Sequence, residues 1–407
     1  MRIIYFHQHF STPQGSTGIR SYEMAQALIA KGHEVTMICG SYAGGNTGLT
    51  QPFEHGKREG KVDGIHVIEL ALDYANDQSF LKRSWVFAKF ALKSIKLALT
   101  RDYDVIFCTT TPLTAGIPGI FAKLLRRKPF IFEVRDLWPE LPKAMGVITN
   151  PIILNLMATL EWLTYKCADR HIALSPGIAD GIARHVNQTS ITTVPNGCDL
   201  SIFAQAQEHW QPEGVEDDDF VALFSGTHGI ANGLDQVIET AKVLKARNCN
   251  KIKLVLIGQG REKSRLMTLA DEHALENILF LPPINKSQLA KLMNRSNVGL
   301  QVLANIPAFY YGTSPNKFFD YIAASLPVIN NYPGWLADQI KSHHCGLVVP
   351  PEDPPAFAQA LINMQENPKE TENMANNAYQ LAKNNYSREL LAEKFISVFE
   401  SVTDVKA

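Results

Sequence analysis

Residues 220–244 read FVALFSGTHGIANGLDQVIETAKVL, and this stretch decides the fold class. It opens with a short apolar run typical of a buried strand and closes with apolar residues at helical spacing. Between the two lies a loop that carries Gly226, Gly229 and Gly233. A strand, a glycine-rich loop and a helix in this order form one βα unit, and such units build a parallel sheet.

The same pattern recurs in both halves of the chain, which predicts an α/β protein with two doubly wound parallel-sheet domains. In the first half we expect strands at 2–10, 34–39, 64–70, 104–109, 129–134, 170–174 and 191–194. In the second half we expect them at 220–224, 253–257, 277–281, 298–302, 327–330 and 346–349.

The stretch 203–219 is rich in Gln, Glu and Asp and lacks an apolar face, which indicates a solvated linker. We therefore predict a Rossmann-like domain over 1–203, a linker over 204–219, a second such domain over 220–385 and a final amphipathic helix over 386–407. Ligand loops lie at the carboxyl ends of parallel strands, so two such domains would meet across a cleft that suits two substrates.

The composition argues against several classes of protein. The 407 residues are 45% hydrophobic and 19% charged, which is typical of a globular chain of two or three domains. A net charge of -1 argues against a dedicated nucleic-acid binder, although residues 1–190 carry an excess of five basic groups. Six scattered cysteines predict neither disulfides nor a zinc site, and we expect a cytoplasmic protein without a signal peptide or membrane-spanning helix.

The second half contains three segments suited to an anionic ligand. The glycine-rich loop after the strand 220–224 exposes the N-terminus of a helix, and the loop in LVLIGQGREKSRL, 254–266, does so again. In FYYGTSPNKFFDYIAASLPVINN, 309–331, we expect Ser314 as the N-cap and Pro315 as the first helical residue. Lys317 can then neutralise a diphosphate and Asp320 can accept ribose hydroxyls, with a surface ion pair as the alternative.

The first half offers two further candidate segments. In FHQHFSTPQGSTGIRSYEMAQAL, 6–28, Gly15 and Gly18 form either a ligand loop or a plain tight turn, and the spacing fails the dinucleotide fingerprint. In FIFEVRDLWPELPKAMG, 130–146, charged residues gather beside Trp138 at the end of a strand. This cluster is either a functional site or a structural ion-pair group, and its members are Glu133, Arg135, Asp136 and Glu140.

Together with ALSPG (173–177) and VPNGCD (194–199), these segments resemble family 4 of the retaining glycosyltransferases, which have the GT-B fold. The resemblance spans the chain. Within the family, the segments are most similar to bacterial O-antigen and capsule transferases that move N-acetylated deoxyhexosamines of the fucosamine type. It implies a UDP-sugar donor and a polyprenyl diphosphate-linked glycan acceptor, with no cofactor and no metal. It also implies that the last helix returns to the first domain, which would bind the acceptor.

The resemblance assigns residue roles as well. The implied donor-binding residues are Gly226, Thr227, His228, Gly229, Gly258, Arg261, Lys263, Ser314, Pro315, Asn316, Lys317 and Asp320. The implied acceptor-binding residues are Gly15, Ser16, Thr17, Gly18, Arg20, Glu133 and Trp138. The implied catalytic residues are Glu133, Arg135, Asp136 and Lys317.

The chain departs from the family pattern at four positions. Gly312 stands where the first glutamate of a Glu-x7-Glu pair is common, and Asp320 replaces the second. Ile230 replaces a basic residue, and Arg135 replaces a histidine. Without an evident nucleophile, retention indicates front-face attack, with the leaving diphosphate accepting the acceptor's proton. A non-hydrolysing nucleotide-sugar epimerase and a non-catalytic member of an assembly complex remain alternatives.

The stretch FLKRSWVFAKFALKSIKLAL, 80–99, is aromatic and basic. Four lysines, at 82, 89, 93 and 96, fall on one helical stripe. We expect this helix to associate with an anionic membrane surface, on the cytoplasmic side. The alternative is a helix that packs its apolar side on the sheet with its lysines in water.

Overall fold

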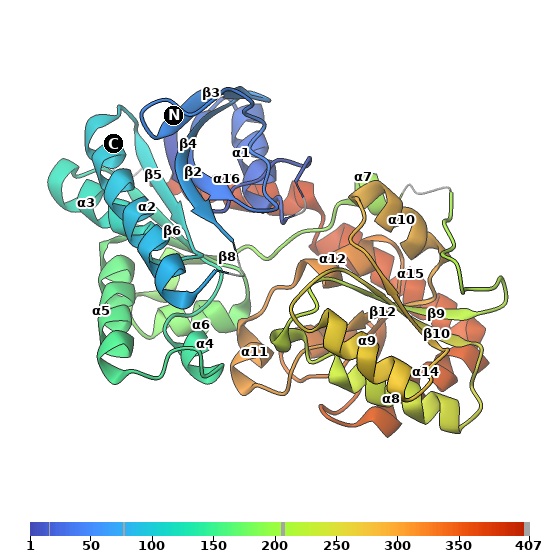
Figure 1. Cartoon of the computed structure of the whole chain (residues 1–407). Coiled ribbons are helices and arrows are strands. Elements are labelled where there is room, and N and C mark those ends of the chain that lie inside the picture. The colour runs from blue at the N-terminus through green and yellow to red at the C-terminus, as the bar shows by residue number, and fades with distance from the viewer. Residues whose placement is uncertain (16, 76–77, 205–207, 403–407) are drawn as a thin grey trace. The chain divides into compact units, whose positions relative to one another are not determined.

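The computed structural model describes residues 1–15, 17–75, 78–204 and 208–402. The chain forms two compact units (Figure 1). Unit 1 contains Met1–Pro195, Gly312–Ser314 and the chain from Leu391 onward, and unit 2 contains Asn196–Tyr311 and Pro315–Leu390. Each unit is built around its own sheet, as the repeated βα pattern predicts.

Unit 1 has an eight-stranded sheet with the order β3-β4-β2-β1-β5-β6-β7-β8. Every neighbouring pair is parallel except β3 and β4, which run antiparallel. The strands are β1 (Arg2–Phe6), β2 (Glu34–Tyr42), β3 (Lys57–Val62), β4 (Ile65–Tyr74), β5 (Val105–Thr109), β6 (Phe130–Val134), β7 (Arg170–Ala173) and β8 (Ile191–Thr193).

Two features of this sheet differ from the expectation. The edge strand β3 was not predicted, because KREGKV lacks the apolar alternation that marks a strand and pairs only through its neighbour β4. Strand β1 ends at Phe6 rather than at residue 10, because residues 8 and 9 form a turn. The end of β1 therefore carries a loop that contains His7, Gln8 and His9.

The helices of unit 1 cover its sheet with buried apolar faces. The last helix contributes Phe395 and Phe399, whose rings lie 5.4 and 5.2 Å from the ring of Phe107 in β5. These helices are α1 (Arg20–Ala30), α2 (Phe80–Thr100), η1 (Leu113–Gly116), α3 (Ile117–Arg126), α4 (Glu140–Ala144), α5 (Pro151–Cys167), α6 (Pro176–Ala183), η2 (Gln188–Ser190) and α16 (Arg388–Ser401), which leaves unit 2 at Leu391. No helix in the described part of the chain is long and apolar enough to cross a membrane.

Unit 2 has a six-stranded, fully parallel sheet with the order β11-β10-β9-β12-β13-β14. Its strands are β9 (Phe220–Ser225), β10 (Ile252–Ile257), β11 (Ile278–Leu281), β12 (Val298–Gln301), β13 (Val328–Asn330) and β14 (Gly346–Val348). Its helices are α7 (Leu200–Phe203), η3 (Ile230–Asn232), α8 (Asp235–Ala246), α9 (Lys263–Glu272), α10 (Lys286–Arg295), α11 (Pro307–Gly312), α12 (Asn316–Ala323), α13 (Trp335–Ser342), α14 (Pro354–Glu366) and α15 (Pro368–Asn385).

The segment expected to be a solvated linker is fastened to unit 2 where it is described. The backbone N–H of Trp210 donates to the carbonyl of Lys291, and the guanidinium of Arg295 donates to the carbonyls of Glu216, Asp217 and Asp219. The change of unit falls at Pro195, before the expected boundary at 203, and Phe203 is buried beneath Lys286 of α10. The polar groups of this segment therefore form hydrogen bonds with α10 as well as with solvent.

Candidate functional site

In unit 2, the loops after β9 and β10 pack backbone against backbone. Gly258 has a φ of +146°, and a Cβ there would lie 1.8 Å from the carbonyl oxygen of Gly226. A Cβ on Gly260 would lie 2.3 Å from the carbonyl oxygen of His228. Only glycine permits this approach, which brings the two loops together at the carboxyl ends of adjacent strands.

Lys317, in the first turn of α12, lies at these loops. Its Nζ donates a 2.7 Å hydrogen bond to Oδ1 of Asn232 and lies 4.2 Å from the ring centroid of Phe224. Asn232 in turn donates to the carbonyl of Thr227 at 2.7 Å, so it connects the lysine to the loop after β9. Burial lowers the pKa of Lys317 to about 7. An ammonium group so poorly hydrated gains from a nearby anion.

The start of α12 differs slightly from the prediction. Pro315, not Ser314, is the N-cap, and the helix begins at Asn316. Proline suits this position because it has no N–H that would need a partner. The N-terminus of the helix is still offered to solvent through the exposed Asn316.

Asp320, one turn further along α12, has different surroundings from Lys317. Burial raises the pKa of this partly buried carboxyl to about 6, while Lys286 and Arg388 lower it and Asp199 raises it. Asp199 is itself buried and forms an ion pair with Arg388 at 3.4 Å. The carboxylate of Asp320 thus lies among charges that three distant parts of the sequence supply, and none of Asp199, Lys286 and Arg388 was predicted to be there.

The cations expected beside Lys317 are arranged differently. Nζ of Lys263 donates to the carbonyls of Gly258 at 2.8 Å and Leu281 at 2.7 Å, so this ammonium ties two loops together. Arg261 is exposed, and the apolar side chain of Ile230 is 61% exposed at the position where the family resemblance implied a basic residue. Lys317 is therefore the best-placed cation for a diphosphate in this loop region.

Three other predicted donor residues lie in the same loop. Thr227 is exposed, Gly229 is partly exposed, and His228 is fully buried between the rings of Phe224 and Phe280. Burial, together with the charges of Lys263 and Lys317, lowers the pKa of His228 to about 4. This imidazole is therefore neutral at physiological pH and adds no charge to the loop.

In unit 1, the predicted residues Arg20, Glu133 and Arg135 come together in a buried network. Nε and Nη2 of Arg20 lie 3.1 and 2.9 Å from Oε2 of Glu133, and Nε of Arg135 lies 3.0 Å from its Oε1. Burial opposes the charge on Glu133, but Arg20 and Arg135 outweigh it and lower the pKa of Glu133 to about 2. Both oxygens of the Glu133 carboxylate already accept hydrogen bonds, from Arg20, Arg135 and Thr109, so this buried side chain holds its neighbours in place.

Arg20 also joins the two ends of unit 1. Its guanidinium donates to the carbonyls of Val194 and Pro195 at 2.8 and 2.6 Å, where the chain leaves this unit. The Arg20 guanidinium hydrogen-bonds to Glu133, Val194 and Pro195 inside the unit, and its side chain is only 6% exposed. These contacts support a positioning role for Arg20, and the acceptor binding that the resemblance implied stays a prediction.

Arg135, Asp136 and Trp138 remain partly exposed after β6. Nη2 of Arg135 donates to the hydroxyl of Ser21 at 2.7 Å, and Asp136 accepts from the hydroxyl of Thr111 at 3.2 Å. Burial raises the pKa of Asp136. The indole nitrogen of Trp138 finds no partner within the described residues, so these side chains are better candidates than Glu133 for contact with a substrate.

The loop before α1 is only partly described. A Cβ on Gly15 would lie 2.1 Å from Oγ of Ser11, so this glycine is required by tight packing of the loop. Gly18 is exposed, and Oγ1 of Thr17 lacks a hydrogen-bond partner among the described atoms. Ser16 lies outside the described residues.

The residues after β1 were not predicted to be functional. Both polar atoms of the Gln8 side chain and Nδ1 of His7 are buried without a hydrogen-bond partner in the described structure, and the two residues are 1% and 4% exposed. The ring of His9 lies 5.0 Å from that of Tyr42 and 4.5 Å from that of Tyr74. Burial, with a contribution from Arg135, lowers the pKa of both histidines, that of His9 to about 4. The sequence signal was the run His-Gln-His at the end of a strand.

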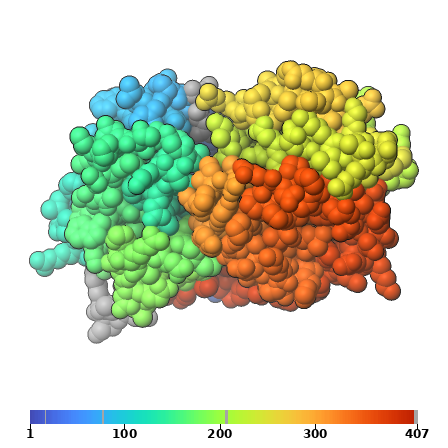
Figure 2. All heavy atoms as spheres, turned by 90° about the horizontal axis from the view of Figure 1, so that it is seen from below, coloured from blue at the N-terminus to red at the C-terminus, as the bar shows by residue number. Residues whose placement is uncertain are grey.

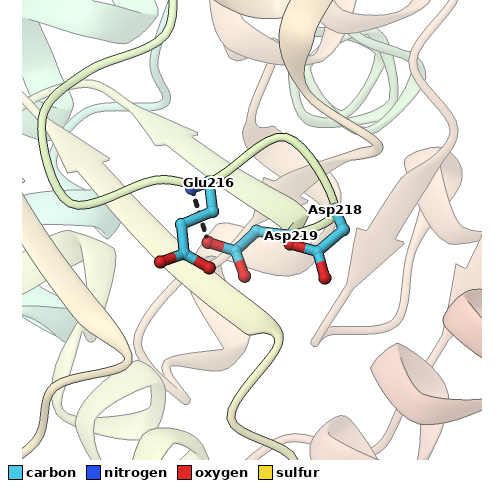
Figure 3. Close-up of side chains that lie close together, drawn as sticks. All are labelled: Glu216, Asp218 and Asp219. Atoms are coloured by element: carbon cyan, nitrogen blue, oxygen red, sulfur yellow. Dashed lines mark hydrogen bonds between the residues drawn. The ribbon is translucent and has the colours of Figure 1, made fainter.

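An acidic cluster lies at the opposite end of the unit 2 sheet. Glu216, Asp218 and Asp219 precede β9, and their carboxylates approach one another within 4.8 Å (Figure 3). Nζ of Lys251 lies 2.7, 2.8 and 3.8 Å from the three, so their charge is partly neutralised by the protein itself. The cluster lies at the other end of the sheet from the loops that Lys317 contacts, and we assign it no ligand.

Two family descriptions match the chain, one in each half. Residues 15–197 match a glycosyl transferase 4-like domain, and residues 205–381 match glycosyl transferases group 1. The first match covers the loop before α1 and the β6 segment, and the second covers both glycine-rich loops and α12.

Relatives of similar length carry glycosyltransferase names. An uncharacterized glycosyltransferase of Methanocaldococcus jannaschii is 22% identical over 95% of this chain and 94% of its own length. The putative colanic acid biosynthesis glycosyl transferase WcaI of Escherichia coli is 24% identical over 74% and 76%. The solved structure of Anabaena HepE in complex with UDP-glucose is 14% identical and superposes with a TM-score of 0.66 over 98% of this chain and 100% of that one. The chain therefore has the GT-B fold, and its two halves match a glycosyl transferase 4-like domain and glycosyl transferases group 1.

Proposed function

We propose that the protein is a retaining glycosyltransferase of family 4 that moves a sugar from a UDP-sugar to a glycan acceptor. The observation that carries this proposal is Lys317, an underhydrated ammonium held by Asn232 at two glycine-rich loops. Such a group favours a diphosphate. The presence of UDP-glucose in a protein of the same fold supports this donor class.

The donor would lie along the carboxyl end of the unit 2 sheet. The diphosphate would meet Nζ of Lys317, the N-terminus of α12 and the loop that contains Gly226, Thr227 and Gly229. Asp320 would accept hydrogen bonds from the ribose, because its carboxylate lies one turn along the same helix. Lys263 and His228 would shape the loops rather than carry charge to the ligand.

The acceptor would bind in unit 1. The unpaired amide of Gln8 and the unpaired imidazole nitrogens of His7 and His9 can exchange hydrogen bonds with sugar hydroxyls. The rings around His9 and the indole of Trp138 provide apolar surface for a sugar ring. Arg135 and Asp136 would complete this side of the site.

The reaction would proceed by front-face substitution at the anomeric carbon. The bond from C1 to the diphosphate oxygen breaks, a bond from C1 to the acceptor oxygen forms on the same face, and the acceptor's proton passes to the leaving diphosphate. The charge that grows on the diphosphate is stabilised by Lys317 and the α12 N-terminus. The residues described here would do this without a protein nucleophile, cofactor or metal.

The substrates we propose are an N-acetylated hexosamine or deoxyhexosamine as the sugar and a polyprenyl diphosphate-linked glycan as the acceptor, in cell-surface polysaccharide synthesis. The similarity to a putative colanic acid transferase supports the pathway class. A lipid-linked acceptor would place the protein at the cytoplasmic face of a membrane.

A donor and acceptor screen tests the proposal. The protein would be incubated with UDP-sugars, N-acetylated hexosamines first, and with soluble analogues of lipid-diphosphate glycans, and UDP release and product would be measured. We expect acceptor-dependent UDP release and an anomeric configuration in the product that matches the donor. An epimerised UDP-sugar formed without acceptor, or donor binding without turnover across the panel, would contradict it.

A further inference from the structure

Helices α2, α3 and α5 lie side by side on one flank of unit 1, with α2 against α3 and α3 against α5 (Figure 1). Their inner faces pack on the sheet through residues such as Phe90 of α2, Ala122 of α3 and Tyr165 of α5. In the space-filling view, the colours of these segments, from cyan-blue to green, adjoin on the same part of unit 1 (Figure 2). We call their outward side the helix face.

The helix face carries an unusual number of exposed apolar side chains. Of the eighteen large hydrophobic residues that are exposed in the described chain, eleven belong to these three helices. The most exposed ones are Leu81, Trp85 and Leu92 of α2, Leu124 and Leu125 of α3, and Ile152 and Leu156 of α5, each between 59% and 79% exposed. A concentration of this kind marks an interaction surface rather than ordinary surface scatter.

The charge on the same helices has one sign. Helices α2 and α3 contain no acidic residue, and the single acidic residue of α5, Glu161, is buried. The basic residues are Lys82, Arg83, Lys89, Lys93 and Lys96 of α2, Lys123 and Arg126 of α3, and Lys166 of α5, of which Lys123 is paired with Asp169 just after α5. Lys89 lies 5.2 Å from the ring centroid of Trp85, so a cation and an exposed aromatic side chain are neighbours on α2.

We propose that the helix face inserts shallowly into an anionic bilayer. Leucine, isoleucine and tryptophan side chains would enter the interface while the lysines reach the lipid phosphates. A second copy of this chain fits less well, because a two-fold contact would bring the same positive charges together. The sequence predicted membrane association only for the basic, aromatic helix α2; the structure adds α3 and α5 and shows which apolar side chains of the three helices are exposed, and salt does not screen their contribution. Membrane binding would bring the protein to the lipid-linked acceptor of the proposed function. The inference rests on that proposed function only for this biological role.

Vesicle binding by the full chain tests the proposal. The probes would be phosphatidylcholine vesicles with and without phosphatidylglycerol, read by co-sedimentation. The triple variant Leu92→Asp/Leu124→Asp/Leu156→Asp removes one exposed apolar residue from each helix without touching a buried one. We expect it to lose at least about tenfold in binding for each leucine. Met267→Asp, which changes an exposed apolar residue of α9 in unit 2, is the matched control and should bind like the wild type.

The charge part is tested with Lys89→Glu/Lys93→Glu/Lys96→Glu, which should weaken binding to anionic vesicles most at low salt. Wild-type binding to anionic vesicles should fall with salt but not vanish. No vesicle binding at low salt, or unchanged binding of the leucine triple variant, would overturn the proposal. A wild-type dimer that the leucine variant dissociates would also overturn it and would assign the face to a second copy. Transfer to a soluble acceptor, measured in parallel, keeps this result separate from a failure of the proposed function.

Discussion

Arg20 and Glu133 stand 113 residues apart in the sequence and form a buried ion pair of 2.9 Å, with side chains that are 6% and 1% exposed. Because Arg20 also donates to the carbonyls of Val194 and Pro195, the pair joins the first helix, the strand β6 and the end of unit 1. Within the charged cluster after β6, this ion pair acts as a clamp that holds the surrounding loops in place.

The first prediction concerns this clamp. Glu133→Gln should lower the free energy of unfolding by about 3 to 5 kcal/mol, because it leaves the Arg20 charge buried without its partner. Glu140→Gln is the control, since its ion pair with Arg184 is exposed and should contribute about 0 to 1 kcal/mol. Urea denaturation measures both, and equal effects would refute the clamp.

The same pair predicts a pH dependence of stability. The pKa of Glu133 is about 2 in the folded protein, below its unfolded value of about 4.3, so its contribution is complete above the unfolded pKa. It should be lost as pH falls from about 4 toward 2. Urea titrations of the wild type and Glu133→Gln should therefore converge toward pH 2, and a constant difference down to that pH would contradict the assignment.

The second prediction is that Asp320→Asn weakens donor binding. The amide keeps the size of the side chain but loses charge-assisted hydrogen bonds worth on the order of 1.5 to 3 kcal/mol each. Calorimetry with UDP should show this loss, whereas Asp338→Asn, an exposed change on α13, should bind normally. An unchanged affinity in a folded Asp320→Asn variant would remove Asp320 from the donor site.

The third prediction concerns Lys317. Lys317→Ala should reduce turnover more than donor affinity, because the charge it meets grows in the transition state. Lys263→Ala, which removes a loop tie, should instead lower stability through two lost hydrogen bonds. Single-turnover rates, donor affinity and thermal unfolding separate the two, and equal or negligible losses of rate and affinity in Lys317→Ala would count against its role.

Donor affinity should also depend on pH in a defined window. Below about 6 Asp320 of the free protein becomes protonated and loses the negative charge that strengthens the hydrogen bonds it accepts, and above about 7 Lys317 loses its proton and positive charge. The affinity for UDP should therefore be highest between these values and fall by up to about tenfold for each further pH unit on either side. Calorimetry between pH 5 and 9 measures this, with Lys317→Ala as the control that should lose the fall at high pH.

The fourth prediction concerns the acceptor side. Gln8→Met replaces a buried, unpaired amide with an apolar chain of similar length, so stability should be unchanged or higher. Transfer should fall through a higher acceptor KM while UDP affinity stays constant, because Gln8 belongs to unit 1 and the proposed donor residues Lys317 and Asp320 to unit 2. Asp136→Ala should likewise raise the acceptor KM and leave the affinity for UDP constant. A loss of UDP affinity in either folded variant would overturn this division.

The local part of the fold and site was predictable. Strands, the glycine-rich loops and α12 follow from periodicity and from residues such as Gly258, whose backbone no other residue could adopt at that contact. The edge strand β3 was missed because its pairing partner, not its own pattern, makes it a strand.

The amino-acid sequence by itself determined the two α/β units, the loops at their strand ends and the presence of a lysine and an aspartate one turn apart. These depend on the spacing of neighbouring residues, which local sterics and burial translate directly into helices, strands and turns. Only the tertiary structure decided that Arg20 pairs with Glu133 and that Lys263 donates hydrogen bonds to loop carbonyls. It likewise decided that Asn232, 85 residues from Lys317 in the sequence, accepts a hydrogen bond from the Lys317 ammonium. It also decided which apolar residues of α2, α3 and α5 remain outside the core. The physical reason is that the burial and charge of a side chain depend on partners that packing brings from distant parts of the chain.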